Sequence, residues 1–352
     1  MKIANNEISG SSGVFIIAEL SANHNGSLQT ALDTIKAAKR AGADAIKLQT
    51  YTADTMTINC NKKDFVINNG SIWDGRKYYE LYQEAYTPWE WHADLFKTAK
   101  EEGLICFSTP FDKTAVDFLE SLDNPIYKIA SFEITDIPLI EYAASKMKPM
   151  IISTGIAAEE DIALAVETCR KAGNNDITLL KCTSSYPAPI EDANLIMIPD
   201  LAKRFGVKAG LSDHTMGSVS PIIAAVLGAK VIEKHFIIDR SIGGPDASFS
   251  MNEHEFSEMV KAVRDAEKAI GTVDYSLNEK IIKNRVFARS LYVVRDIKKG
   301  EVFTEENVRS IRPGNGMHPK HLKDIIGKKA AYDIEMGEAF KAEFIETGSQ
   351  KV

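Results

Sequence analysis

Two histidines follow short apolar runs and are the residues best placed to bind a metal. His214 ends the run GLSDH and His235 ends the run VIEKH. Neutral imidazoles from neighbouring strands can hold a divalent ion and leave coordination positions open for water and substrate. Two ligands alone suit a catalytic metal better than a structural one. The alternative interpretation is a pair of buried histidines that only form hydrogen bonds. The remaining histidines are expected in loops or on the surface: His24, His92, His254, His318 and His321.

Lysines recur in the same apolar runs, at Lys47, Lys128, Lys181 and Lys234. A buried lysine is costly unless it is paired, so several lysines directed at one pocket indicate an anionic ligand. Because side chains alternate along a strand, Lys47 and Gln49 share one face, whereas Glu233 and His235 share the face opposite to Lys234. The alternative is that each lysine pairs with a neighbouring acid and has a structural role.

Hydroxyl and carboxylate side chains complete the set of candidate groups. Hydroxyls near strand ends and backbone N–H groups at helix starts suit phosphate oxygens, although each hydroxyl alone could be a helix cap. Glu19 closes the first run and Asp246 follows the last; either could orient water or a substrate hydroxyl, or cap a loop. The hydroxyls are Ser108 and Thr109, Ser131, Ser153 and Thr154, Thr183 to Ser185, and Ser212.

The elements that must position these groups alternate between apolar runs and helix-like segments. Short, continuously apolar runs are typical of strands that are buried on both faces. Eight such units over about 250 residues favour an α/β fold of the (β/α)8 TIM-barrel type over an open sheet, with reacting groups at the strand C-termini. The second connection, 50–87, is long and is expected to build specificity or to cover the site. The runs are 14–20, 45–49, 104–109, 126–130, 149–154, 177–182, 207–212 and 230–235.

The C-terminal part of the chain differs in pattern and predicts a second domain. DIKKGEVFTEENV at 296–308 resembles DIEMGEAFKAEFI at 333–345, a weak internal repeat rich in short β-like runs. We therefore expect a catalytic barrel at 1–270, a linker at 271–288 and a small β-rich domain at 289–352.

Composition narrows the functional classes further. The formal net charge of −7 argues against nucleic acid or an anionic membrane as a partner. The first 30 residues show neither a signal peptide nor a membrane span, and the four scattered cysteines favour a reducing, cytoplasmic location.

Ten motifs in this order resemble the sialic acid synthase family over nearly the whole chain. That resemblance implies a TIM barrel followed by an antifreeze-like (SAF, β-clip) domain. KYYELYQEAYTPWEWH at 77–92 resembles the pseudaminic acid synthase branch, and N-acetylneuraminate and legionaminic acid synthases stay open as alternatives. The motifs are FIIAELSANHNG, DAIKLQTY, FSTPFD, YKIASFEI, ISTG, KCTSSYPAP, GLSDHT, IEKHF, GPDASFSMN and IRPGNGM.

The resemblance also implies roles for individual residues. His214 and His235 match the pair that binds a divalent cation, usually Mn²⁺, with Mg²⁺ or Co²⁺ as alternatives. Arg312 matches an arginine delivered by the partner subunit, which implies a domain-swapped homodimer. Residues matching phosphoenolpyruvate contacts are Lys47, Thr109, Lys128, Ser131, Ser153, Ser184, Ser212 and His214, with Ser184 in place of the asparagine of N-acetylneuraminate enzymes. Residues matching the surroundings of the N-acetylated amino sugar are Glu19, Gln49, Tyr186, Asp246 and Phe287.

The implied reaction is the condensation of phosphoenolpyruvate with an N-acetylated amino sugar, with loss of phosphate by C–O cleavage. Glu19 is expected to steer or deprotonate a reacting group, and Asp246 to assist near the metal. One rival is a lyase that adds free pyruvate through a Schiff base on Lys128 or Lys181. A second rival is an inactive protein that binds carbohydrate or ice.

Overall fold

The computed structural model describes residues 2–3, 6–7 and 13–346. The chain divides into two compact units, Met1–Gly271 and Thr272–Val352.

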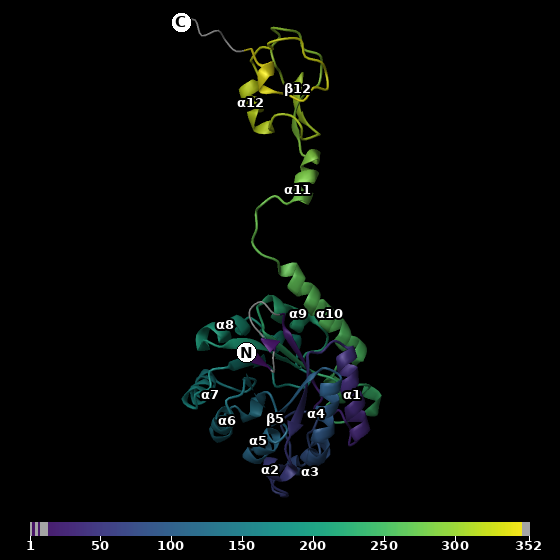
Figure 1. Ribbon diagram of the computed structural model, residues 1–352, viewed down its shortest axis with the longest axis vertical. Helices are drawn as coiled ribbons and strands as arrows, with labels where there is room; N and C mark the ends of the chain where they lie inside the picture. The colour runs from purple at the N-terminus through teal and green to yellow at the C-terminus, as the bar shows by residue number, and fades with distance from the viewer. Residues whose placement is uncertain (1, 4–5, 8–12, 347–352) are drawn as a thin grey trace. The chain divides into compact units, whose positions relative to one another are not determined.

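Eight parallel strands of the first unit close into a barrel in which β10 pairs with both β3 and β9. The helices lie around the outside of the strands (Figure 1). Two short antiparallel strands, β1 (Lys2–Ile3) and β2 (Asn6–Glu7), precede the barrel in the sequence. The barrel strands are β3 (Phe15–Glu19), β4 (Ala45–Thr50), β5 (Ile105–Pro110), β6 (Tyr127–Ile129), β7 (Met150–Ser153), β8 (Ile177–Cys182), β9 (Lys208–Asp213) and β10 (Val231–His235).

The helices of the first unit begin and end at ordinary capping signals. Ser27 caps α1 by accepting from the Thr30 N–H, and Asn252 forms a capping box with Glu255 at the start of α10. The α-helices are α1 (Leu28–Arg40), α2 (Ala53–Met56), α3 (Tyr78–Ala85), α4 (His92–Glu101), α5 (Lys113–Glu120), α6 (Ile137–Ala144), α7 (Glu159–Lys171), α8 (Met197–Phe205), α9 (Val219–Val226) and α10 (Glu253–Ile270). Short 3-10 turns include η1 (Lys63–Phe65), η2 (Trp89–Trp91), η3 (Ser131–Glu133), η4 (Ile190–Ala193), η5 (Arg240–Ile242) and η6 (Ala247–Phe249).

Alternation along the strands sorts the core into two layers. One cluster joins the alternate strand residues Phe15, Ile17, Ala45, Phe107, Ile126, Ile151, Leu180 and Val231. Because these residues come from six different strands and from Ile126, just before β6, and pack together, they fill the barrel interior. A larger cluster, which includes Ile16, Ile46 and Ile232, packs between the strands and the helices. Residues two positions beyond the interior set therefore face the interior at the C-terminal end of the barrel.

The connection after β4 contains more regular structure than the sequence predicts. It holds α2, η1 and α3 before η2 and α4 begin. Residues 66–77 close on themselves through an antiparallel bridge between Val66 and Lys77, and the Ile67 N–H donates to the Arg76 carbonyl over 2.8 Å. Residues 66–77 therefore form an ordered, hydrogen-bonded loop.

The second unit is built around a small apolar core. Leu291, Phe303, Phe340 and Phe344 are among its buried residues. β11 (Ser290–Val293) and β12 (Val308–Ile311) form an antiparallel pair. Isolated bridges, such as that between Ile297 and Ile334, connect other segments of the unit. Its helices are α11 (Glu279–Asn284), η7 (Arg285–Phe287), η8 (Pro319–His321), α12 (Leu322–Ile325) and η9 (Ala342–Phe344).

The internal repeat predicted in this unit has a physical counterpart. Asp333 accepts from the Lys299 N–H over 2.8 Å, and Asp296 accepts from the Met336 N–H over 2.8 Å. In each copy of the repeat, the first Asp therefore accepts a hydrogen bond from the equivalent backbone N–H of the other copy. Among the described residues of both units, the helices are all too short or too polar to cross a membrane.

Candidate active site

The interior-facing residues at the strand ends form a single polar layer. By alternation from the interior cluster, each strand directs at least one polar or thiol side chain inward at its C-terminal end. The strands thereby bring together most of the predicted site residues. The layer comprises Glu19, Lys47, Gln49, Thr109, Lys128, Ser153, Cys182, Ser212, His214, Glu233 and His235.

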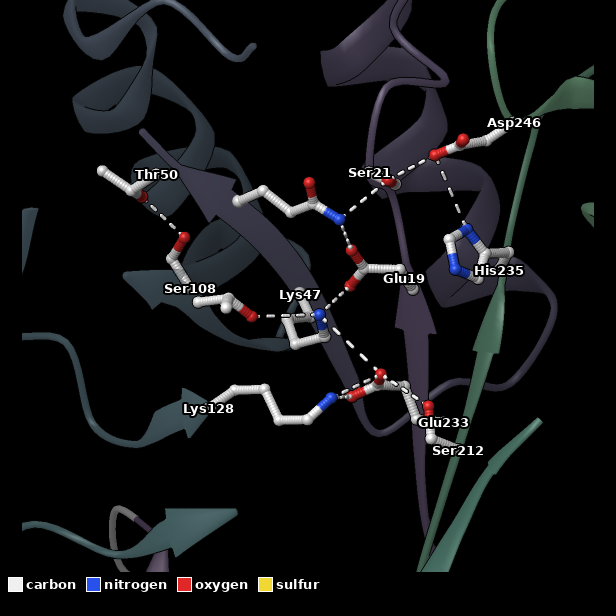
Figure 2. A network of polar contacts seen from close by, with 12 residues as sticks. Glu19, Ser21, Lys47, Thr50, Ser108, Lys128, Ser212, Glu233, His235 and Asp246 are labelled. Carbon is white, nitrogen blue, oxygen red and sulfur yellow. Dashed lines mark hydrogen bonds and ion pairs between the residues drawn. The ribbon is translucent and has the colours of Figure 1, made fainter. Parts of the chain in front are cut away.

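A buried charge cluster lies at the centre of this layer. Lys128 Nζ donates to both Glu233 oxygens, at 2.8 and 3.0 Å. β6 and β10 lie opposite each other in the barrel order, so this pair crosses the interior (Figure 2). Lys47 Nζ lies 2.6 Å from Glu19 Oε2 and 3.8 Å from Glu233 Oε1, and it donates to Thr109 Oγ1 over 3.1 Å.

The two acids of the cluster titrate in opposite directions. Burial raises the pKa of Glu19 to about 7, although Lys47 opposes the shift. Burial also acts to raise the pKa of Glu233, but Lys128 and Lys47 outweigh it and bring that pKa to about 2. The two lysines therefore share one firmly ionised carboxylate. Two lysines around one ionised carboxylate suit the binding of an anionic ligand.

A hydrogen-bonded chain runs from the charge cluster to Asp246, beside His235. Gln49 Nε2 donates to Glu19 Oε1 over 3.0 Å and to Ser21 Oγ over 2.9 Å. Ser21 Oγ donates to Asp246, whose Oδ2 lies 3.8 Å from His235 Nδ1. Figure 2 shows Ser21 between Glu19 and Asp246. Asp246 is thereby fixed beside the His235 ring.

The histidine pair fits a divalent cation. The rings of His214 and His235 have their centroids 5.2 Å apart. His214 Nδ1 donates to the Thr183 carbonyl over 2.9 Å, which leaves Nε2 as its free acceptor. His235 Nδ1 is buried without a hydrogen-bond partner among the described residues, and burial together with His214 lowers the pKa of His235. No group of three or more His, Cys, Asp or Glu within the described ranges could hold a metal, so an ion here would need substrate or water as further ligands.

A group of hydroxyls gathers around Gly155, beside the histidines. The Gly155 N–H donates to Ser131 Oγ over 3.1 Å. A Cβ at this position would lie 2.1 Å from Ser184 Oγ and 2.8 Å from Ser131 Oγ, so only glycine fits. Ser153 Oγ is buried and has no hydrogen-bond partner in the described part of the chain. An unpaired buried hydroxyl at the end of β7 is suited to donate a hydrogen bond to a ligand oxygen.

A cavity of about 420 Å³ opens beside the polar layer. Gln49, Tyr186, His235 and Asp246 line it on the side of the strand ends. The rest of its lining comes mainly from the connection after β4 and from Phe111, Phe132 and Glu133. Its size suits a monosaccharide.

Two of the four candidate lysines lie outside the interior layer, and one prediction about a histidine is wrong. Lys181 and Lys234 face away from the interior: Lys181 donates to the Cys182 carbonyl over 2.9 Å, and Lys234 lies 2.6 Å from Asp213. Alternation explains both, because each is adjacent to an interior-facing residue. His24 lies in a turn, as predicted, although it is buried. His92 is buried at the start of α4 and so is neither in a loop nor on the surface; its Nε2 and Thr50 Oγ1 are hydrogen-bonded over 2.8 Å.

Two predicted site residues, Phe287 and Arg312, belong to the second unit, where both side chains are exposed. Their predicted roles at the site therefore stay predictions.

Sequence reasoning missed four groups that the structure places at the site. Glu233 had been assigned only to a strand face, and Ser21 had no signal beyond its neighbour Glu19. Cys182 Sγ lies 3.9 Å from His214 Nδ1, and that histidine lowers the thiol pKa to about 7 against the effect of burial. Glu133 lines the cavity. Alternation from Leu180 could have found Cys182.

Glu133 gives a testable pH dependence of stability. Burial and the nearby Asp136 raise its pKa from 4.5 to about 7. The folded state thus binds this proton more tightly than the unfolded chain; the resulting stabilisation is complete below the unfolded pKa and is lost as pH rises through about 7. Glu133→Gln should therefore gain thermal stability relative to the wild type between pH 5 and pH 8. Thermal melts at both values check this, with Glu141→Gln, an exposed residue of α6, as control. An equal stability difference at both pH values would contradict it.

The closed barrel and its buried cationic layer define a TIM-barrel enzyme for a small anionic substrate. The chain belongs to the NeuB family, whose model matches residues 34–275. The SAF domain model matches residues 288–346. The predicted fold class, a TIM barrel followed by a SAF domain, is thereby confirmed, as is the resemblance to the family.

Relatives with assigned activities match along nearly the whole chain. Pseudaminic acid synthase of Campylobacter jejuni is 55% identical, with 93% of this chain and 95% of the relative covered. Pseudaminic acid synthase of Helicobacter pylori is 50% identical, with 94% and 97% covered. An N,N'-diacetyllegionaminic acid synthase of Legionella pneumophila is 37% identical, with 94% of each covered.

Solved structures agree with the fold. The spore coat polysaccharide biosynthesis protein SpsE of Bacillus subtilis is 35% identical, with a TM-score of 0.67 and 99% of each chain covered. The N-acetylneuraminic acid synthetase of Leptospira borgpetersenii, solved with citrate, is 31% identical, with a TM-score of 0.72, 81% of this chain and 94% of that chain covered.

Proposed function

We propose that this chain condenses phosphoenolpyruvate with 2,4-diacetamido-2,4,6-trideoxy-β-L-altropyranose and water, giving pseudaminic acid and phosphate. The observation that carries the proposal is the buried pair Lys47 and Lys128, held beside the histidine pair and the sugar-sized cavity. The identities of 50–55% to pseudaminic acid synthases support this product over legionaminic acid or N-acetylneuraminate.

Phosphoenolpyruvate would bind across the polar layer. Its phosphate and carboxylate need several cations and hydroxyl donors. Lys47 and Lys128 supply the cations, and the serine hydroxyls around Gly155 supply the donors. Thr109 and Ser212 already hydrogen-bond to Lys47 and Glu233, so they also orient the charged groups. The proposed contacts are Lys47, Thr109, Lys128, Ser131, Ser153, Ser184, Ser212 and His214.

A divalent cation, Mn²⁺ before Mg²⁺ or Co²⁺, would be held by His214 and His235. When bound, such an ion supplies Lewis-acid polarisation of the sugar aldehyde. The buried, unpartnered Nδ1 of His235 supports this assignment, and Asp246 would orient a water or hydroxyl ligand.

The protein's own groups then position two substrates for carbon–carbon bond formation. C3 of phosphoenolpyruvate attacks the open-chain aldehyde, water adds to the resulting oxocarbenium carbon C2, and phosphate leaves with the bridging oxygen. Glu19, with its pKa raised to about 7, is suited to take or give a proton at this site, and Gln49 holds its other oxygen. Correct positioning can supply roughly 7–11 kcal/mol of the barrier reduction.

Bridging-¹⁸O phosphoenolpyruvate tests this reaction class. With the diacetamido sugar and Mn²⁺, all label should appear in phosphate and none in the sugar acid. Label retained in the organic product would indicate P–O cleavage and overturn the proposed chemistry.

A Schiff-base lyase is the main rival chemistry. Lys128 is paired with Glu233 and Lys181 faces outward, so neither is a free amine in the interior. Borohydride added with pyruvate should leave the protein mass unchanged, whereas a trapped adduct would favour the lyase.

We further propose a domain-swapped homodimer in the cytoplasm, in which Arg312 and Phe287 act at the partner's barrel. Exposed apolar side chains along residues 273–287, including Val273, Tyr275 and Phe287, support an interface there. The four free cysteines fit a reducing compartment.

Cross-subunit action predicts complementation between two inactive variants. Arg312→Ala and Lys47→Ala should each be nearly inactive, because each removes a charge from the anion site. Mixed and re-equilibrated, they should recover about a quarter of wild-type activity, since random pairing makes half of the dimers hybrid, each with one intact site. Phosphate release measures this, and no recovery despite proven subunit exchange would contradict donation by the partner.

A further inference from the structure

The cavity has one wall whose shape depends on an exposed aspartate. Asp74 accepts hydrogen bonds from the backbone N–H groups of Asn69, Gly70 and Ser71, at 3.1, 2.9 and 3.1 Å. Ser71 Oγ donates to the same carboxylate over 3.2 Å. One carboxylate thus satisfies four donors of a single turn, which is an effective way to fix a loop.

The fixed turn presents alternate residues to the cavity. Ile67, Asn69, Ser71 and Trp73 all line it, whereas Asp74 points to solvent. Trp73 also packs on Tyr186, with ring centroids 5.5 Å apart, and Tyr186 packs on His214 at 4.4 Å. Through Trp73, this wall contacts Tyr186, whose ring in turn packs on His214 of the histidine pair.

The chemistry of this wall suits a particular end of the acceptor sugar. The aldehyde carbon must lie near His235 and Asp246, so C4 to C6 of the sugar extend toward the lining from 66–82. Ile67, Leu81 and Tyr82 offer apolar contact for a methyl group. Asn69 and Ser71 offer hydrogen-bonding groups for an amide, and Trp73 Nε1 is a buried donor without an acceptor among the described residues.

We propose that the 66–77 turn, held in shape by Asp74, is the specificity wall that recognises the 4-acetamido and 6-deoxy end of the acceptor. Asp74 is a positioning residue: it contacts the turn and not the sugar. The inference rests on the proposed function, because it requires that a diacetamido trideoxy sugar is the acceptor.

Asp74→Ala tests the proposal through selectivity. The variant should raise KM for the diacetamido sugar about tenfold, and it should reduce the preference for that sugar over N-acetylmannosamine by a similar factor. KM for phosphoenolpyruvate should stay within about twofold, since Lys47 and Lys128 lie outside the turn. Asp64→Ala, an exposed aspartate of the same connection with no such turn, is the matched control and should behave as wild type.

A second variant guards against misfolding of the turn. Trp73→Phe keeps an aromatic ring but loses the pyrrole part of the indole with its N–H, so it should lower the same preference, and its melting temperature shows whether the turn stays folded. Unchanged preference in both variants, or equal changes in KM for both substrates, overturns the specificity wall. Wild-type protein that uses neither sugar would instead refute the proposed function, before any variant is compared.

Discussion

Lys128→Met should lower kcat/KM for phosphoenolpyruvate by about three orders of magnitude. The substitution removes a cation from the anion site and leaves Glu233 buried without its 2.8 Å partner. Breaking a buried pair by removing one member typically costs about 3–5 kcal/mol. Steady-state kinetics and denaturant unfolding measure the two consequences separately.

A second substitution separates the catalytic effect from the structural one. Lys128→Met/Glu233→Gln removes both charges, so it should recover much of the lost stability without recovering activity. Lys208→Met is the control. Lys208 is the first residue of β9, at the end of the barrel away from the polar layer, and its Nζ lies 3.2 Å from Asp176 Oδ1. Activity that returns with stability in the double variant would show that Lys128 serves only folding.

His235→Ala should abolish metal-dependent turnover, with kcat reduced by about three orders of magnitude, because a Lewis acid supplies several kcal/mol. Calorimetric titration should show loss of Mn²⁺ binding by the folded variant. His254→Ala is the matched control, since this exposed histidine of α10 lies 3.5 Å from Glu258 and outside the polar layer. Near-wild-type turnover in His235→Ala would refute the metal assignment.

The sequence predicted the barrel well because alternation and apolar runs are local properties. The spacing of Lys47 and Gln49 on one face, and of Glu233 and His235 on one face, is reproduced by their positions beyond Ala45 and Val231. The same rule directs Lys234 away from Glu233 and His235, as the structure shows, and it directs Lys181 away from the interior-facing Cys182.

Other parts of the site depend on contacts between distant segments. Glu233 meets Lys128 across 105 positions of sequence, so its role follows from barrel closure and not from its own run. The buried ring of His92 is hydrogen-bonded to Thr50, a contact that no local pattern indicates. The turn at 66–77 is held by hydrogen bonds to the Asp74 carboxylate. The sequence shows only that this connection is long and does not indicate those hydrogen bonds.

The most direct test of the central claim is acceptor choice during phosphate release. Phosphoenolpyruvate and Mn²⁺ are offered with 2,4-diacetamido-2,4,6-trideoxy-β-L-altropyranose and with N-acetylmannosamine in parallel, and the sugar acids are identified by mass. The account predicts strong preference for the diacetamido sugar, with one phosphate released per pseudaminic acid formed. Preference for N-acetylmannosamine, or phosphate release without a new sugar acid, would contradict it.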